Sequence, residues 1–581
     1  MNPYLQYLQA GIERVRVQLA GTRGLPLLAL LGLVTGLVAA GIIILFRLVV
    51  ESSQAGFLPL SDPENYEALG WTTRLYLATG GGLLLGILFY VTARPPLRVG
   101  ILHVLERLGY HEGLLPFKNM IFQFVGAGIA IISGQSVGRE APSVHLGAAS
   151  GSLLGQKMRL PNNSIRILVA CGSAGAIAAS FNTPLAGVIF AMEVVMMEYT
   201  ISGFIPVILA AVSATATNRM VVESHPAFIV PALELNSLWE LIIIVIMGVG
   251  IGAIAAVFIH SLKWITHKGK QLPLPLRMAL AGFSVGICAI VCPQVMGIGY
   301  DTVNLALLGS IAVHLLLLIL VFKLLATVIS IGLSIPAGLI GPILFIGAIF
   351  GSLTGLLLEH LPGVNSSPPG LYAMLGMGAM MGATLQAPLA ALIALLELTG
   401  NQYIIFPGML AIVSASLSAQ EIFGTQSVFI SQMQEMGLDY RNDPVAQSLR
   451  RLGVAAVMNQ NFVIVQPQIS SKQAQNLLAK EPQWLVISRK EGNQLMPATD
   501  LVRFLETDSG EQVDLMEVPS KRRQLAPVLQ QSTLQQALKI LDETDAEALY
   551  VIRPVGVSAD RIYGIVTRQD IEEKYRLQQQ Y

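Results

Sequence analysis

The stretch from Gly138 to Gly155, GREAPSVHLGAASGSLLG, decides the organisation of this chain because it is repeated. It recurs as GLIGPILFIGAIFGSLTG from Gly338 to Gly355, and Gly, Pro, Ala, Ser and Leu positions match without a gap. A second pair follows, in which FNTPLAGVIFAME (181–193) is similar to LQAPLAALIALLE (385–397). Shared apolar composition does not explain two ordered matches at nearly one offset. The sequence therefore predicts a duplicated membrane unit.

Each copy of the first stretch has the layout of a helix start. A glycine opens a turn, Pro142 or Pro342 sits where its missing N–H costs nothing, and a helix rich in small residues follows. Such an N-terminus offers free N–H groups and a positive dipole end to an anion. The alternative is ordinary loop punctuation between spans. Two copies, one of them with Arg139-Glu140 in apolar surroundings, favour a binding site.

Composition identifies a polytopic membrane protein. Of 581 residues, 53% are hydrophobic and 12% charged, and the mean hydropathy is +0.62, whereas soluble proteins carry about 25% charged residues. The net charge of zero argues against a nucleic-acid partner. The three cysteines lie in apolar segments and show neither a disulfide framework nor zinc spacing.

The chain order predicts six regions. Residues 1–24 resemble a basic interfacial helix on the cytoplasmic side, without the design of a cleaved signal peptide. Residues 25–218 and 238–424 hold the two membrane repeats, whose apolar stretches are often too long or too short for one straight span, as in tilted or broken helices. Their relative orientation stays open. A polar linker (425–451) leads to two similar α/β units at 452–506 and 518–578.

Glu140 is the foremost candidate for function. A carboxylate at a helix N-terminus competes with a permeating anion for the same positive potential, and protonation lets it leave. Alternatively, it only complements the helix dipole. Glu193 and Glu397 end the second matched pair; they act as proton relays or as helix caps, and their presence in both copies favours capping. Lys323 either balances a carboxylate or attracts anions.

One motif points elsewhere. Gly134-Gln-Ser-Val-Gly138 matches the nucleophile elbow of serine hydrolases. That elbow requires a preceding strand and a histidine in an α/β sheet. The flanks here are membrane segments, so we interpret the match as accidental and do not expect an enzyme.

At these residues the sequence resembles the CLC family of chloride channels and transporters. SGQSVGREAP (133–142) resembles the family's GREGP motif with Ala141 in place of its second glycine, and GLIGP (338–342) resembles GxFxP with Ile340 in place of phenylalanine. Residues 323–338 and 386–400 resemble the adjoining segments. The tail resembles a pair of CBS domains, most clearly at GIVTRQD (564–570).

The resemblance implies an all-α polytopic membrane protein of two inverted repeats with broken helices, plus an α/β cytosolic CBS pair. It also implies a homodimer with one anion pathway per subunit, chloride as the transported ion, and no required cofactor. Glu140 matches the external gating glutamate. Gly138, Arg139, Gly338, Leu339 and Ile340 match the anion-binding segments, where the N–H groups of Leu339 and Ile340 would hold the central ion. Neutral amides suit turnover because a fixed cation binds too tightly.

Three departures from the family pattern matter. No GSGIP serine motif is found, and ARPPLRVGILHV (93–104) occupies its region; Phe429 takes the place of the central tyrosine. Without both hydroxyls, we expect a weaker central site and looser halide selectivity, at about 1–3 kcal/mol per lost hydrogen bond. Val194 stands where the internal proton-transfer glutamate would be, although Glu198 or water could substitute. This favours a passive anion channel over a chloride/proton antiporter.

In the tail, Thr567 and Asp570 match positions that contact ribose and phosphate, so ATP or another adenine nucleotide is a candidate ligand. The first unit has Pro497 where that threonine would lie, three residues before Asp500, and a structural dimerisation role is equally supported.

Two other classes compete. A membrane cation transporter with regulatory domains needs several converging carboxylates, and two helix N-termini would repel its cation. A non-transporting sensor would not need paired broken helices. We expect a bacterial inner membrane protein with both termini cytoplasmic, with small anions, the bilayer and a second copy as partners, and no bound metal.

Overall fold

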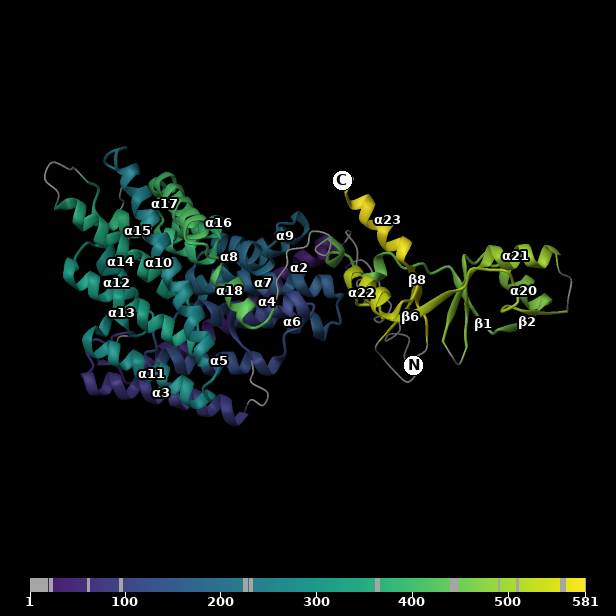
Figure 1. Ribbon diagram of the computed structural model, residues 1–581, viewed down its shortest axis with the longest axis horizontal. Coiled ribbons are helices and arrows are strands. Elements are labelled where there is room, and N and C mark those ends of the chain that lie inside the picture. The colour runs from purple at the N-terminus through teal and green to yellow at the C-terminus, as the bar shows by residue number, and fades with distance from the viewer. Residues whose placement is uncertain are drawn as a thin grey trace. The chain divides into compact units, whose positions relative to one another are not determined.

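The computed structural model describes residues 19, 24–59, 63–92, 98–222, 228, 234–360, 366–438, 448–489, 492–507, 511–553 and 561–579. The chain divides into two compact units. The membrane unit comprises residues 29–156 and 166–440, and residues 441–581 make up most of the tail unit (Figure 1). The interfacial helix expected at 1–24 lies almost wholly outside the described residues.

The first membrane repeat combines continuous membrane-length helices with shorter helices that follow interruptions in the chain. Its elements are α2 (Leu25–Ala55), α3 (Trp71–Thr92), α4 (Gly100–Tyr110), α5 (Phe117–Ile132), α6 (Glu140–Lys157), α7 (Asn162–Phe181), α8 (Pro184–Phe190), the π-helix η3 (Ala191–Met196) and α9 (Ile201–Val221). The apolar stretch 165–197 is thus two helices. It is interrupted where Asn182 adopts a positive φ of 58° and Pro184 starts α8.

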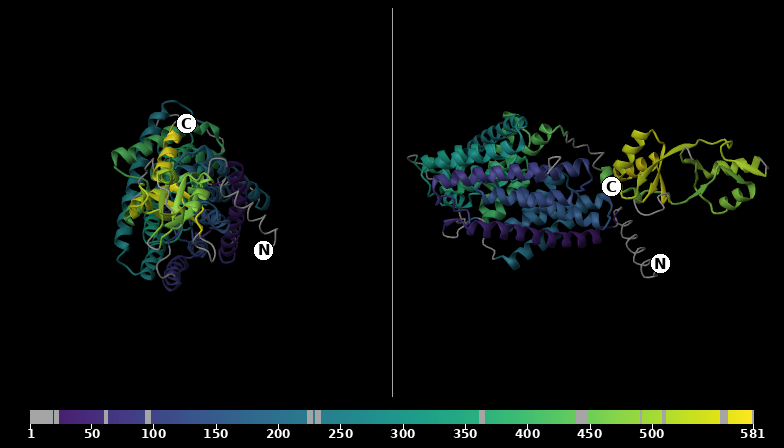
Figure 2. Two further views of the ribbon diagram at one scale, coloured as in Figure 1. Left: turned by 90° about the vertical axis from the view of Figure 1, so that its right-hand side faces the viewer. Right: turned by 90° about the horizontal axis from the view of Figure 1, so that it is seen from below.

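The second repeat has the same plan. Its elements are α10 (Glu240–Gly269), α11 (Leu274–Val291), η4 (Pro293–Val295), α12 (Tyr300–Leu307), α13 (Val313–Gly332), α14 (Ile340–Glu359), α15 (Pro369–Leu385), α16 (Pro388–Thr399), η5 (Gln402–Ile404), α17 (Ile405–Leu417), η6 (Ser418–Ile422) and α18 (Val428–Glu435). Among the described residues, nine helices are long and apolar enough to cross a membrane. The long helices of this unit run roughly parallel to one another in the right-hand view of Figure 2.

The two repeats meet at the glycines that open the repeated stretch. Gly138 N–H donates to the carbonyl of Gly338 at 2.7 Å, and Gly338 N–H donates back to Gly138 at 2.8 Å. This bridge is antiparallel, so equivalent segments run in opposite directions. The prediction of a duplicated unit is confirmed, and the orientation that the sequence left open is inverted.

Small residues let the central helices approach closely. A Cβ on Gly147 of α6 would lie 2.1 Å from the carbonyl oxygen of Gly172 in α7. The equivalent Gly347 of α14 stands in the same relation to Gly376 of α15, at 2.2 Å. Glycine at such crossings is typical of helices packed within membranes. The two repeats therefore share their helix packing as well as their sequence.

The central helices are buried by the others. The most apolar 18-residue segments of α7 and α14 are 89% and 83% buried inside the protein, whereas that of α3 is 28% buried. Helix α3 lies beside α11 at one edge of the unit (Figure 1). A helix buried on all sides contributes backbone ends to the protein interior rather than to lipid. This is where unpaired helix termini are tolerated at membrane depth.

The tail contains two α/β units of one design. The first has β1 (Phe462–Val465), β2 (Gln468–Ser470), α20 (Ser471–Leu478), β3 (Trp484–Ile487), β4 (Gln494–Pro497) and α21 (Ala498–Thr507). β5 (Gln512–Asp514) follows in the chain and packs with this first unit. The second has β6 (Arg523–Leu529), α22 (Leu534–Thr544), β7 (Ala548–Ile552), β8 (Gly564–Thr567) and α23 (Arg568–Gln579).

The strands of both tail units join in one sheet. Its order is β1-β3-β4-β6-β7-β8, and β2 pairs with β5 separately. In each unit a parallel pair (β1 with β3, β6 with β7) is followed by an antiparallel pair (β3 with β4, β7 with β8). This duplicated α/β arrangement is consistent with a CBS pair.

Candidate anion site and gate

The Glu140 carboxylate lies where the helix starts of the two repeats converge. Glu140 is the first residue of α6, and its side chain is 1% exposed. The carboxylate faces the backbone N–H of Gly341 in the opposite repeat as well as its own. It therefore occupies the positive potential that a permeating anion would use, as expected for a closed gate.

Glycines make room for this carboxylate. A Cβ added at Gly138 would lie 1.9 Å from Glu140 Oε2, and one added at Gly341 would lie 2.8 Å from Oε1. Oε2 is buried and has no hydrogen-bond partner among the described residues. A buried carboxylate oxygen without a donor is less stable than a paired one.

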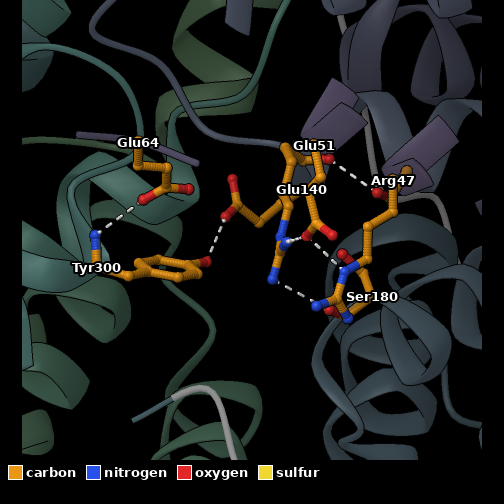
Figure 3. Close-up of polar contacts among 8 residues, drawn as sticks. Arg47, Glu51, Glu64, Glu140, Ser180 and Tyr300 are labelled. Atoms are coloured by element: carbon orange, nitrogen blue, oxygen red, sulfur yellow. Dashed lines mark hydrogen bonds and ion pairs between the residues drawn. The ribbon is translucent and has the colours of Figure 1, made fainter. Parts of the chain in front are cut away.

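Tyr300 provides the side-chain hydrogen bond to the carboxylate. Its hydroxyl donates to Glu140 Oε1 at 3.2 Å, while its backbone N–H donates to the Glu64 carboxylate at 3.4 Å. Figure 3 shows Tyr300 between these two acids. Glu64 belongs to the loop between α2 and α3, and Tyr300 is the first residue of α12. Three distant segments thus meet at Tyr300.

The Arg139 guanidinium packs against two aromatic rings. Its guanidinium carbon lies 5.5 Å from the ring centre of Phe181 and 5.4 Å from that of Tyr300. A nitrogen donates to the carbonyl of Ser180 at 3.3 Å, and another lies 4.0 Å from Glu51. The charge of Arg139 is therefore shared with rings and an acid instead of being presented alone to an ion.

An apolar cavity of about 40 Å³ adjoins Glu140. The carboxylate is its charged wall, Ile340 lies on its α14 side and Phe190 on its α8 side. Its remaining lining is mostly apolar: Ile177, Phe181, Thr183, Ala186, Leu344, Met381, Ala394 and Leu398. The volume holds two or three water molecules, but few polar groups would bind them.

The other predicted anion contacts lie at helix starts. Leu339 immediately precedes α14 and Ile340 begins it, and both side chains are buried. Phe429 is buried in the first turn of α18, and Val99 precedes α4 in the region that the serine motif would occupy. Neither of the last two residues has a hydroxyl, so neither side chain is a donor at these positions.

Glu193 and Glu397 cap each other's helices. Glu193 accepts from the N–H groups of Leu389 (3.3 Å) and Ala390 (2.6 Å) at the start of α16. Glu397 accepts in the same way from Leu185 (3.0 Å) and Ala186 (2.7 Å) at the start of α8. These are the contacts that the capping interpretation predicted.

Lys323 does not balance one of these carboxylates through direct contact. It is fully buried, and its ammonium donates to the carbonyls of Val295 (3.1 Å), Gly297 (3.0 Å) and Ile298 (3.4 Å). It therefore fixes the loop that leads into Tyr300. Ser136 of the hydrolase-like motif follows helix α5, and its hydroxyl pairs with that of Thr327 at 3.0 Å.

The sequence alone does not single out Tyr300 or Glu64 as residues of this site. The only local signal is Gly297-Ile-Gly299-Tyr300, in which both glycines have positive φ (60° and 83°) and set the direction of the chain before α12. Nothing in that signal indicates which acid the tyrosine reaches, because Glu64 and Glu140 lie 236 and 160 residues away in the chain.

In the tail, Thr567 and Asp570 bond to each other. The Thr567 hydroxyl and N–H both donate to Asp570 Oδ2 at 2.7 Å, and Asp570 N–H lies 3.2 Å from the Thr567 hydroxyl oxygen. This reciprocal pattern caps the start of α23. The two residues have a structural role before any ligand is considered.

The inverted repeats and the buried carboxylate between their helix starts define a membrane anion transport protein. Residues 81–420 match the family described as voltage gated chloride channel. The chain belongs to this family, known as CLC.

Named relatives include both channels and exchangers. The chain is 31% identical over 387 residues to a protein of Ralstonia nicotianae named as a ClcB-like chloride channel protein, covering 66% of this chain and 90% of that one. It is 28% identical over 334 residues to the H(+)/Cl(-) exchange transporter ClcA of Vibrio cholerae, covering 55% and 71%.

Solved structures share the fold. A slow cyanobacterial Cl-/H+ antiporter has a TM-score of 0.60 at 23% identity, covering 72% of this chain and 98% of its own. A eukaryotic CLC transporter has a TM-score of 0.59 at 20% identity and covers 94% of this chain and 97% of its own. The chain is therefore an integral membrane, CLC-type anion transport protein.

Proposed function

We propose that this protein is a passive chloride channel whose pathway is closed by the Glu140 carboxylate. The observation that carries the proposal is Val194, which is buried in η3 at the position where a proton-coupled relative would need an acid. An isopropyl group neither accepts nor donates a proton, so coupled exchange would need another carrier.

The acids near Val194 are already engaged. Glu193 accepts two backbone hydrogen bonds at the start of α16. Glu198 is buried and lies 3.9 Å from the Arg166 guanidinium, both side chains being less than a tenth exposed. Glu198 is therefore engaged by a neighbouring cation inside the protein, which makes it a poor substitute carrier.

The space between Glu140 and Phe190 also disfavours proton transfer. Phe190 ends α8, and η3 with Val194 follows directly. The intervening cavity is lined mainly by apolar side chains, so a continuous chain of water would lack polar anchors.

Chloride/proton exchange is the second candidate, because several relatives carry that name. We further propose a homodimer in a bacterial inner membrane with both termini cytoplasmic. In support, α8, α9, α16 and α17 carry exposed apolar side chains that a second copy could cover: Leu185, Ile205, Val212, Leu389, Met409 and Val413.

The test is chloride efflux from proteoliposomes with simultaneous recording of internal pH. A channel gives efflux without proton movement, and Glu140→Gln removes its dependence on pH. Glu240→Gln is the matched control, because Glu240 is another buried acid at a helix start, bonded by Tyr372. Proton uptake driven uphill by a chloride gradient would establish exchange instead. Wild-type flux in Glu140→Gln would exclude Glu140 as the gate.

A further inference from the structure

We propose that Tyr300 is the latch of this gate: its hydroxyl holds the Glu140 carboxylate in the closed position, and opening requires that hydrogen bond to break. The inference rests on the proposed gating role of Glu140. It adds a positioning residue from the first turn of α12, an element that provides neither of the two helix starts at the anion site.

The first support is the hydrogen bond itself. Tyr300 Oη lies 3.2 Å from Glu140 Oε1, whereas Oε2 has no partner in the described part of the chain. Among the described residues, the Tyr300 hydroxyl is thus the side-chain donor to the Glu140 carboxylate, and the other donors are backbone N–H groups. A donor to the charged form favours the ionised, closed state over the protonated, open one.

The second support is that Tyr300 is held in place independently of Glu140. Lys323 binds three carbonyls of the preceding loop, and the N–H of Gly297 donates to Gly134 at 3.3 Å. The ring of Tyr300 packs edge-to-face on Phe228, with centroids 5.1 Å apart. A donor fixed before the carboxylate arrives loses little entropy when the bond forms.

Several charged groups surround the Tyr300 hydroxyl, and all of them are independent of it. Arg139 stacks on the Tyr300 ring, Glu64 accepts from the Tyr300 backbone, and Asp301 and Lys323 flank the same loop. Glu51 compensates part of the Arg139 charge. Replacing only the hydroxyl leaves all these groups in place, so its effect is separable from theirs.

Tyr300→Phe keeps the ring and removes the donor. Because a hydrogen bond to a charged group shifts an equilibrium by roughly tenfold or more, we expect the pH of half-maximal chloride efflux to rise by about one unit. Efflux at neutral pH rises with it. 3-Fluorotyrosine at position 300 is a stronger donor and shifts the midpoint toward acid. This second variant also decides the question if the phenylalanine protein does not fold.

Two further variants separate the latch from the gate. In a Glu140→Gln background, Tyr300→Phe adds no further change, because the charged acceptor is already gone. Tyr372→Phe removes a tyrosine bond to the buried Glu240 and leaves the midpoint unchanged. A wild-type midpoint in Tyr300→Phe, with an altered one in Glu140→Gln, overturns the latch alone. Wild-type behaviour in Glu140→Gln overturns the gate and the latch together.

Discussion

At the scale of single residues, the site differs from its family pattern because two of its positions lack a hydroxyl that could donate a hydrogen bond. Phe429 and Val99 stand in regions where the resemblance leads one to expect hydroxyls, and both lack a donor. The central ion would then depend on backbone N–H groups, such as those of Leu339 and Ile340. Backbone donors stabilise any small anion, so discrimination among halides should be loose.

Phe429→Tyr should restore part of that discrimination. A hydrogen bond to an anion contributes about 1.5–3 kcal/mol. If about 1 kcal/mol of this is lost with the larger iodide, we expect the chloride-to-iodide flux ratio to rise roughly fivefold. The ratio is measured in proteoliposomes for the variant and the wild type. Strong selectivity for chloride in the wild type would contradict the prediction, since it would mean that other donors already supply it.

Glu64 provides a second residue-scale prediction. Burial is the main cause that raises the pKa of its carboxyl from 4.5 to about 7, and Asp301 adds to the rise while Arg139 opposes it. The folded protein therefore binds the proton more tightly than the unfolded chain. The resulting stability is present below about pH 4.5 and is lost as pH rises through 7.

Glu64→Gln should remove this part of the pH dependence. The measurement is the unfolding temperature of the purified protein in detergent as a function of pH, compared with the exposed control Glu359→Gln. An identical slope in wild type and Glu64→Gln between pH 4.5 and 7 would show that Glu64 titrates as an ordinary acid.

At the scale of elements, one helix in each repeat has its N-terminus capped by a glutamate of the opposite repeat. Glu193 closes α16 and Glu397 closes α8. Each carboxylate satisfies N–H groups that a helix leaves unpaired. The pair therefore ties the repeats together at a second place besides the Gly138–Gly338 bridge.

Glu193→Gln and Glu397→Gln should each destabilise the protein by about 1–2 kcal/mol, the range of a charged cap. Thermal unfolding in detergent measures the loss, with Glu359→Gln as the control. Neither change should alter proton movement during chloride efflux. If Glu193→Gln abolished proton coupling and left stability intact, Glu193 would be a relay and not a cap.

The sequence predicted where the apolar helical segments lie, but not where the helices end or which of them come into contact. Hydropathy located the apolar stretches, but it left 165–197 and 370–399 undivided, whereas Pro184 and Pro388 start new helices within them. The split of 370–399 occurs at Gln386, whose φ of 52° no composition rule indicates. Glu140 could be found because it is charged in an apolar stretch. Tyr300 could not, because its partner is defined only by the fold.

At the scale of the whole molecule, the tail repeats a design as the membrane unit does. The Thr567–Asp570 pair is complete without a ligand. We therefore expect Asp570→Asn to weaken the α23 cap by about 1 kcal/mol and calorimetric titration of the intact protein with millimolar ATP to give no heat. Heat in the wild type that disappears in Asp570→Asn would contradict this and establish nucleotide binding.

The Gly138–Gly338 bridge has a further consequence because the residues beside it are not equivalent. If Gly138 corresponds to Gly338, then Glu140 corresponds to Ile340. An isoleucine does not compete with an anion for a helix start, so the near-symmetric architecture has a carboxylate at the helix start of one repeat and an apolar side chain at the equivalent position of the other. Ions that enter from opposite sides then meet unequal barriers. The current through the protein should therefore rectify when the salt solution is the same on both sides of the membrane.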